Sequence, residues 1–281
     1  MPTPRCAAIH DLSGLGRCSL TVALPVLSAM GVQCCPLPTA LLSTQTGGFH
    51  DFTFLDLTEE MTRIAAHWKS LHLPFQAIYS GFLGSAQQID LVEQFLSDFR
   101  QEDTLVVVDP VMGDHGEIYQ TYTPELCAGM CRLAAHADLI TPNLTEAALL
   151  LGLPGDALHH KTQAEYQDLV KALSLKGSRS VVLTGVSLSP GEIGAMCFDA
   201  EAAACSVVQF PQVPREFPGT GDLFASVLTG ALLQGAALPE AAARAADFVG
   251  RCMERTVAQG LPPREGVDFE PLLGTLIRPA L

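Results

Sequence analysis

The hydrophobic positions along the chain fall into two alternating patterns. Short runs of β-branched and other apolar residues, each bounded by glycine, proline or polar residues, predict buried strands. These strands are expected at residues 6–9, 32–36, 77–80, 104–109, 139–141, 180–184, 195–198 and 206–210. Elsewhere, apolar residues recur three and four positions apart, which is typical of helices that bury one face. These helices are expected at residues 60–71, 87–100, 126–135, 222–234 and 238–256.

The expected fold follows from this alternation. Strands such as the one at residues 104–109 are apolar almost throughout, which indicates a parallel sheet covered on both faces. The sequence therefore predicts a doubly wound α/β fold, with a central, mostly parallel sheet and helices on both sides. No flexible linker and no internal repeat is visible, so residues 1–281 are expected to form one domain. Residues 36–53, with two prolines and a Gly-Gly pair, are expected to leave the sheet and cover a site.

Composition narrows the class of protein. Of the 281 residues, 48% are hydrophobic and 16% are charged, which excludes intrinsic disorder. The net charge of −14 argues against nucleic-acid binding. No apolar run reaches the length of a membrane span, and residues 1–8 do not resemble a signal peptide. Nine cysteines without a Cys-x-x-Cys pair predict reduced thiols. We therefore expect a cytoplasmic protein that binds neither nucleic acid nor membranes.

Polar residues follow five of the predicted strands, at the sheet edge where parallel sheets bind their ligands. They are His10–Asp11, Ser80–Gly81, Asp109–Pro110, Thr141–Pro142–Asn143 and Thr184–Gly185. Each group taken alone is compatible with a turn or a helix cap. Together they predict a ligand-binding rim.

The sharpest motif is Phe-Pro-Gly-Thr-Gly-Asp at residues 217–222, which opens a predicted helix. Gly219, Thr220 and Gly221 would let backbone N–H groups face a ligand at the positive end of the helix dipole, which predicts an anion hole. Asp222 is either the N-cap of this helix or a general base beside a transferring phosphoryl group. In the second case, we expect the positive dipole to keep its carboxylate ionised.

Two further carboxylates follow predicted strands. Asp109 ends the most apolar strand, and Glu146 lies one turn after Asn143 at a predicted helix start. Asn143 and Glu146 can form a capping box, which needs no ligand. Alternatively, Asp109 and Glu146 would suit Mg²⁺, which takes one or two carboxylates together with phosphate oxygens.

Two glycine-containing segments have competing interpretations. Residues 11–16 resemble a fragment of a dinucleotide fingerprint, but Ser19 stands where the third glycine is needed. A nicotinamide-dependent oxidoreductase is therefore disfavoured. Residues 113–122, with two glycines and two tyrosines, predict either a mobile flap that excludes water from a kinase site or an ordinary surface loop.

Four of these segments, taken in order, resemble the ribokinase superfamily. Residues 219–222 and the apolar helix after them carry the superfamily resemblance, and residues 80–85, 109–113 and 142–146 are similar to its vitamin B6 kinase branch. The resemblance implies a ribokinase-like fold, dependence on ATP and Mg²⁺, and transfer of the γ-phosphoryl group of ATP to a primary alcohol. It also implies a homodimer, and it leaves open a requirement for a monovalent cation such as K⁺.

The same resemblance implies roles for single residues. Asp222 matches the base that takes the proton of the substrate's 5′-hydroxyl, and Gly219, Thr220 and Gly221 match the anion hole. Asp109 and Glu146 match positions near Mg²⁺ and the ATP phosphates. Further ATP contacts are expected at Thr141, Asn143, Thr184, Phe210, Pro211, Gln212 and Val213. Thr184 replaces a lysine common in one group of B6 kinases, so a phosphate contact there is weaker or is supplied elsewhere.

The resemblance places the acceptor site at Asp11, Ser13, Gln45, Thr46 and Gly47. Many B6 kinases have Ser at the position of Asp11, and the segment around Asp11, with Gln45, looks closer to hydroxymethylpyrimidine kinases. An ionised Asp11 would favour pyridoxamine among the vitamers, unless Asp11 only caps the helix expected near residue 15.

A B6 vitamer is the expected substrate, because many hydroxymethylpyrimidine kinases have Cys where this chain has Asp222. Hydroxymethylpyrimidine remains the alternative substrate. A non-catalytic vitamin-sensing protein is a third reading, which an intact Asp222 beside an intact glycine pair disfavours.

Overall fold

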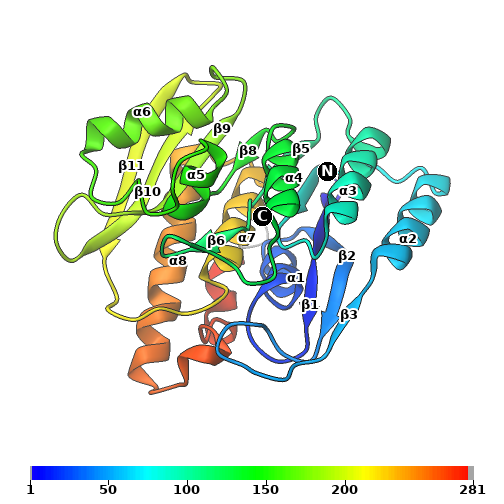
Figure 1. Ribbon diagram of the computed structural model, residues 1–281, viewed down its shortest axis with the longest axis horizontal. Coiled ribbons are helices and arrows are strands. Elements are labelled where there is room, and N and C mark those ends of the chain that lie inside the picture. Colours follow the sequence, from blue (N-terminus) through cyan, green and yellow to red (C-terminus); the bar gives the residue numbers. More distant parts are fainter. Residues whose placement is uncertain (1, 278–281) are drawn as a thin grey trace.

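The computed structural model describes residues 2–277, and a nine-stranded sheet runs through this part of the chain (Figure 1). The strands are β1 (Arg5–Ser13), β2 (Gln33–Leu42), β3 (Phe54–Asp56), β4 (Ala77–Ser80), β5 (Leu105–Val108), β6 (Gly113–Asp114), β7 (Glu117–Ile118), β8 (Leu139–Ile140), β9 (Ser180–Val186), β10 (Glu192–Asp199) and β11 (Ala204–Pro211). The helices are α1 (Ser19–Ala29), α2 (Thr58–Ser70), α3 (Ala86–Phe99), α4 (Pro124–Ala134), α5 (Leu144–Leu150), α6 (Gln163–Leu173), α7 (Thr220–Leu233) and α8 (Leu238–Ala258), with 3₁₀ turns η1 (Pro263–Glu265) and η2 (Glu270–Leu276).

The sheet has the strand order β11-β10-β9-β8-β5-β4-β1-β2-β3. All pairs from β9 through β8, β5, β4 and β1 to β2 are parallel, and antiparallel pairs occur only towards the two edges. The predicted α/β fold with a mostly parallel sheet is therefore confirmed. Because the central strands run in one direction, their carboxyl ends meet at one edge, where the polar residues were expected.

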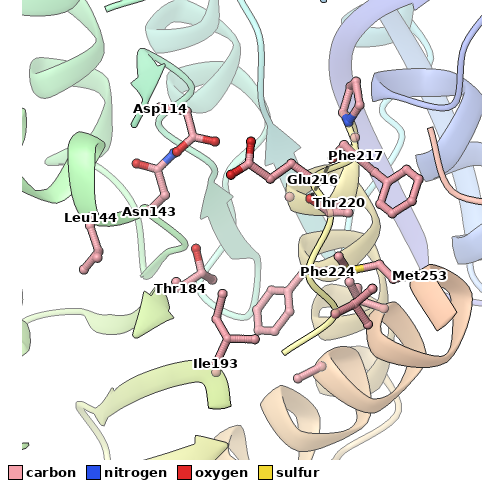
Figure 2. Close-up of a pocket in the computed structure, with 18 of the residues that line it drawn as sticks. Asp114, Asn143, Leu144, Thr184, Ile193, Glu216, Phe217, Thr220, Phe224 and Met253 are labelled. Atoms are coloured by element: carbon pink, nitrogen blue, oxygen red, sulfur yellow. Dashed lines mark hydrogen bonds between the residues drawn. The ribbon is translucent and has the colours of Figure 1, made fainter. Parts of the chain in front are cut away.

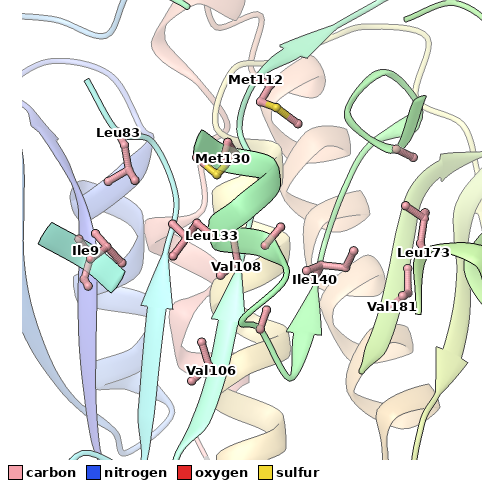
Figure 3. Packing of buried hydrophobic residues seen from close by; sticks show 14 of the residues in the cluster. Ile9, Leu83, Val106, Val108, Met112, Met130, Leu133, Ile140, Leu173 and Val181 are labelled. Atoms are coloured by element: carbon pink, nitrogen blue, oxygen red, sulfur yellow. The ribbon is translucent and has the colours of Figure 1, made fainter. Parts of the chain in front are cut away.

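Helices cover both faces of the sheet, and this explains why its strands are apolar almost throughout. On one face, Ile9 and Val108 pack against residues of α2 to α6, among them Met130 of α4 (Figure 3). On the other face, the neighbouring strand residue Ala8 packs with residues of α1, α7 and α8. The second layer includes α7, whose N-terminus carries the glycine-rich motif.

The segments with the clearest pattern are predicted well. The strand at residues 77–80 agrees with β4 at both ends, and the helix at 87–100 differs from α3 by one residue at each end. Thr123 caps α4, accepting a hydrogen bond of 3.2 Å from the Leu126 N–H, with Pro124 in the first turn. The pattern does not predict α6, and it places the first helix too early.

Of two expectations about the N-terminal third, one is wrong and the other is wrong in part, because residues 43–53 lie outside the strands as expected and residues 36–42 do not. Residues 36–42 do not leave the sheet, because they continue β2 alongside β1 as far as Leu42. Strand β3 pairs only with the last three residues of β2, so Pro36 and Pro38 lie where β2 has an open edge and a missing N–H is tolerated. The helix expected near residue 15 begins at Ser19 instead, because β1 continues through Ser13.

Among residues 2–277, none of the helices combines the length and the apolar character that crossing a bilayer requires.

Candidate active site

A cavity of about 810 Å³ opens near the carboxyl ends of β5, β8 and β9, beside the start of α7 (Figure 2). This volume lies in the range of small-molecule and cofactor sites. Its lining includes every residue that the resemblance assigns to the base, the anion hole and ATP, namely Asp109, Thr141, Asn143, Glu146, Thr184, Phe210, Pro211, Gln212, Val213, Gly219, Thr220, Gly221 and Asp222. Tertiary structure therefore brings these residues together around one space.

The turn before α7 depends on Gly219. Its φ of +79° lies in the left-handed region, and a Cβ atom there would lie 1.9 Å from the backbone oxygen of Arg17. Only glycine fits this position. The helix begins directly afterwards at Thr220, so the free N–H groups of its first turn face the cavity edge, as an anion hole requires.

Asp222 lies in the first turn of α7, and this position excludes one of its two interpretations. The N-cap of α7 is Gly219, so the interpretation of Asp222 as an N-cap is wrong. Its side chain is 14% exposed and lines the cavity. The Nδ1 atom of His10 lies 3.9 Å from Oδ1 of Asp222.

The helix dipole does not keep Asp222 fully ionised, contrary to expectation. Burial raises the pKa of Asp222 to about 7, although a hydrogen bond from the Ser19 backbone acts in the opposite direction. The nearby charge of Asp11 adds to the rise in pKa. Near neutral pH, both the protonated and the ionised form of Asp222 are therefore populated.

Glu146 forms the capping box that the sequence allowed. The Asn143 N–H donates to Oε2 of Glu146 at 2.9 Å, and the Glu146 N–H donates to Oδ1 of Asn143 at 2.9 Å. The Met112 N–H also donates to Oε1 of Glu146 at 3.2 Å. The capping-box interpretation is thus confirmed, and Glu146 in addition anchors the segment that leads into residues 113–122.

Asp109 and Glu146 have the character of a site for a hard cation. Burial raises the pKa of Asp109 to about 8, with a contribution from the charge of Asp222, and the Thr141 hydroxyl donates to Asp109 at 3.1 Å. Burial also raises the pKa of Glu146, and the charge of Asp109 raises it further. Two buried carboxylates that repel each other are suited to bind Mg²⁺.

The donor set supports Mg²⁺ only together with other ligands. Within residues 2–277, no group of three or more His, Cys, Asp or Glu side chains could hold a metal ion. Mg²⁺ commonly uses one or two protein carboxylates and completes its shell with phosphate oxygens and water. Asp109 and Glu146 fit that mode of binding.

Residues 113–122 begin with a two-stranded hairpin, β6 and β7, at the cavity edge. Its base is fixed by the Asn143 side-chain amide, which donates to the Gly113 oxygen at 2.9 Å. At its tip, Nε2 of His115 lies 3.2 Å from a carboxylate oxygen of Glu216, which lies in the loop before α7. The hairpin therefore contacts both sides of the cavity mouth, as a flap would.

The residues expected at the acceptor site do not line this cavity. Both carboxylate oxygens of Asp11 accept hydrogen bonds, one from the Ser13 hydroxyl at 2.9 Å and the other from the Ser19 hydroxyl. Since Asp11 does not precede a helix at residue 15, the interpretation as its cap is wrong. Asp11 instead holds together the end of β1 and the start of α1.

The loop after β2 is similarly closed on itself. The Gln45 amide donates to the backbone oxygens of Gly47 and Arg264, and its Oε1 accepts from the Gly47 N–H at 3.1 Å. Thr46 and Gly47 are exposed, and a Cβ atom at Gly47 would lie 3.7 Å from Pro218, which lines the cavity. The loop therefore adjoins the cavity next to the start of α7 without forming its wall.

Sequence reasoning missed two features of the cavity. Apolar side chains of β10, α7 and α8 form one wall, among them Ile193, Phe224 and Met253 (Figure 2). Arg215 is the only Lys or Arg among the described lining residues, and its side chain makes no hydrogen bond or ion pair within residues 2–277. The amphipathic pattern of α8 could have indicated a buried face, but not that part of this face is open to a ligand.

The chain is similar to known proteins over most of its length. The phosphomethylpyrimidine kinase family matches residues 22–265. A pyridoxine/pyridoxal/pyridoxamine kinase of Bordetella avium is 31% identical over 239 residues, which cover 80% of this chain and 76% of the relative.

Two solved structures are similar over nearly the whole chain. A Bacteroides thetaiotaomicron protein, provisionally named a phosphomethylpyrimidine kinase and crystallised with pyridoxal, is 44% identical with a TM-score of 0.93, covering 99% of this chain and 97% of that one. The pyridoxal kinase of Lactobacillus plantarum is 34% identical with a TM-score of 0.88, covering 97% and 96%. The chain therefore belongs to the phosphomethylpyrimidine kinase family, within the ribokinase superfamily that its motifs indicated.

Proposed function

We propose that this chain is an ATP-dependent kinase that phosphorylates the 5′-hydroxymethyl group of a vitamin B6 vitamer, giving the 5′-phosphate and ADP. The observation that carries this proposal is Asp222, which lies beside an anion hole and lines a cavity of nucleotide size. The pyridoxal bound to the Bacteroides relative and the B6 kinases among the similar proteins support the choice of substrate.

Asp222 acts as the general base in this reaction. Its carboxylate accepts the proton of the acceptor hydroxyl while the oxygen of that hydroxyl attacks the γ-phosphorus of ATP, and the bond to the β-phosphate oxygen breaks. Because the pKa of Asp222 is about 7, the carboxylate is a stronger base than an exposed aspartate and is still ionised in a large fraction of molecules.

The start of α7 stabilises the group being transferred. Backbone N–H groups around Gly219 and Gly221 lack partners within the helix, and the helix dipole adds positive potential there. Charge spread over the phosphoryl oxygens in the transition state would be met by these fixed donors.

The rest of the cavity suits a nucleotide. The apolar wall with Ile193, Phe224 and Met253 offers a surface for a flat base. Thr184 stands where one group of B6 kinases has a lysine, and Arg215 would supply the missing positive charge to the phosphates. Asp109 and Glu146 would hold Mg²⁺, which when bound neutralises phosphate charge.

The hairpin at the cavity mouth has a proposed role in excluding water. A kinase site open to solvent would transfer the phosphoryl group to water instead of the acceptor. The contacts of the hairpin with Asn143 and Glu216 place it where closure would cover the phosphates.

A hydroxymethylpyrimidine is the second candidate acceptor. The matching family is named for phosphomethylpyrimidine kinases, and both kinds of acceptor are flat rings with a hydroxymethyl group. We retain the B6 vitamer as the first choice because of the bound pyridoxal in the 44% identical relative.

A coupled ADP-release assay tests the proposal. The purified protein is given ATP and Mg²⁺ with pyridoxal, pyridoxine, pyridoxamine or hydroxymethylpyrimidine, each measured over a range of concentrations. The highest kcat/KM is expected for a B6 vitamer. Turnover of hydroxymethylpyrimidine alone would instead assign the chain to thiamine synthesis, and binding without turnover would indicate a sensor.

Further expected properties are also part of the proposal. We propose a cytoplasmic location and a homodimer, the second of which sedimentation equilibrium would test. We also propose that Mg²⁺ is required, which the same assay with EDTA would test. Replacing K⁺ by Na⁺ at constant ionic strength would show whether a monovalent cation contributes.

A further inference from the structure

A buried histidine lies next to the proposed base. His10, near the end of β1, is fully buried, and neither of its ring nitrogens has a hydrogen-bond partner within residues 2–277. Leaving a buried polar atom unpaired destabilises the folded protein. A side chain that destabilises the fold in this way calls for a reason beyond packing.

The ring of His10 is held in place by its neighbours. The Tyr79 ring packs edge-on against it, with 4.3 Å between the ring centroids and an interplanar angle of 71°. A Cβ atom at Gly81 would lie 2.3 Å from Nδ1 of His10, so the imidazole fits only because residue 81 is glycine. With the ring in this place, Nδ1 lies 3.9 Å from Oδ1 of Asp222.

The charge state of His10 leaves it one N–H with which to donate. Burial lowers the pKa of His10 to about 3, although the Tyr79 backbone acts in the opposite direction, so the ring is neutral near pH 7 and carries one N–H. A proton on Nδ1 points this N–H at the carboxylate of Asp222. The backbone N–H of Ser19 favours the ionised form of Asp222, whereas the charge of Asp11 acts against it.

We propose that His10 is a positioning residue for Asp222, whose Oδ1 accepts a hydrogen bond from the Nδ1–H of His10. The bond fixes one carboxylate oxygen and leaves the other facing the acceptor hydroxyl. The 3.9 Å separation shortens when substrates fill the cavity, as catalytic hydrogen bonds often do. The inference rests on the proposed function, since it concerns the base of that reaction.

Two substitutions of similar shape separate this role from packing. His10→Asn keeps an N–H donor at the position of Nδ1, whereas His10→Leu puts a methyl group there. We expect His10→Leu to lower kcat about 10- to 100-fold, with the KM values for ATP and acceptor changed less than about twofold. His10→Asn should recover most of kcat.

Stability provides the second readout. His10→Leu removes two unpaired nitrogen atoms, so its melting temperature should equal or exceed that of the wild type while its kcat falls. A residue that acts only in packing would lose activity together with stability. Thr229→Val is the matched control, because it removes another unpaired buried polar atom from α7, two turns beyond Asp222, and should leave kcat unchanged.

These experiments distinguish failure of the proposed role of His10 from failure of the proposed function. An unchanged kcat in His10→Leu, or equal losses in the Leu and Asn variants, would overturn the positioning role while wild-type activity upheld the kinase. A wild-type protein inactive with all four acceptors would overturn the proposed function and the role of His10 with it.

Discussion

Asp222 and Asp11 lie close together beside the start of α1, yet their carboxylates are satisfied in different ways. Asp11 accepts hydrogen bonds from two serine hydroxyls and lies outside the cavity lining. Asp222 lines the cavity and accepts only from the Ser19 backbone within residues 2–277. Internal hydrogen bonds offset part of the cost of burying the Asp11 carboxylate, whereas the Asp222 carboxylate has fewer of them and keeps more capacity to accept a hydrogen bond from a ligand. The sequence motifs presented both as site residues, and their hydrogen bonds separate them.

The largest effect is expected for the base itself. Asp222→Asn keeps the shape but removes the proton acceptor, so kcat should fall about 10²- to 10⁴-fold. ATP affinity should change less than about threefold, because the anion hole is formed by the backbone. Turnover and ATP binding measured on the same sample check both parts. Glu59→Gln, an 89% exposed side chain on α2, is the control that should match the wild type.

Loss of ATP binding with normal turnover per bound complex would contradict the role of Asp222 as a base. The pH dependence gives an independent check. The base must be ionised, and its pKa is about 7. We therefore expect kcat/KM to be highest above this pH and to fall as the pH drops through it.

The next largest effect is expected when Asp109 is replaced. The replacement should lower activity and raise stability. Burial raises the pKa of Asp109 to about 8, so the folded protein binds its proton more tightly than the unfolded chain. The contribution of Asp109 to the free energy of unfolding without ligand should therefore be largest below about pH 4 and should be lost as the pH rises towards about 8.

Asp109→Asn removes this buried charge. At pH 8 its melting temperature should rise by about 2–4 °C, the shift that about 1 kcal/mol produces in a chain of roughly this size, while Mg²⁺-dependent activity is lost. Thermal unfolding at pH 6 and pH 8 measures the difference. A variant less stable than the wild type at pH 8 would show that Asp109 stabilises the fold, as Asp11 does.

Asp11→Ser tests the other side of the comparison. Losing the carboxylate removes the acceptors of Ser13 and Ser19, and Ser19 has a φ of +49°, which needs support from its surroundings. The free energy of unfolding measured in urea should fall by about 1–3 kcal/mol. The relative kcat/KM values of the three vitamers should stay the same. A selective loss with pyridoxamine would instead mean that Asp11 meets the amine of the substrate.

The smallest effect on activity is expected for the contact between His115 and Glu216, because both side chains are exposed. His115 and Glu216 form an ion pair across the cavity mouth with side chains 62% and 79% exposed, and such pairs contribute little. His115→Gln should therefore change the KM for ATP less than about twofold. ATP hydrolysis measured without acceptor would rise strongly only if this contact alone kept the hairpin closed.

The sequence by itself determined the local helices and strands and the glycine-rich turn before α7. Apolar strands such as β4 and β5 can be recognised because both faces of a parallel sheet are buried. The motif at residues 217–222 can also be recognised from the sequence, because only glycine tolerates the backbone conformation of Gly219. These features depend on neighbours in the chain, so the pattern of residues predicts them.

Tertiary structure alone decided how the carboxylates are used. The pKa of Asp222 depends on burial between α7, the end of β1 and the start of α1, and no local pattern reports that burial. The same holds for the hydrogen bonds of Asp11 with Ser13 and Ser19, whereas its contact with the substrate stays a prediction. The proximity of His10 to Asp222 likewise arises only when β1 and α7 pack together, because hydrogen bonding and desolvation act between groups that folding brings close.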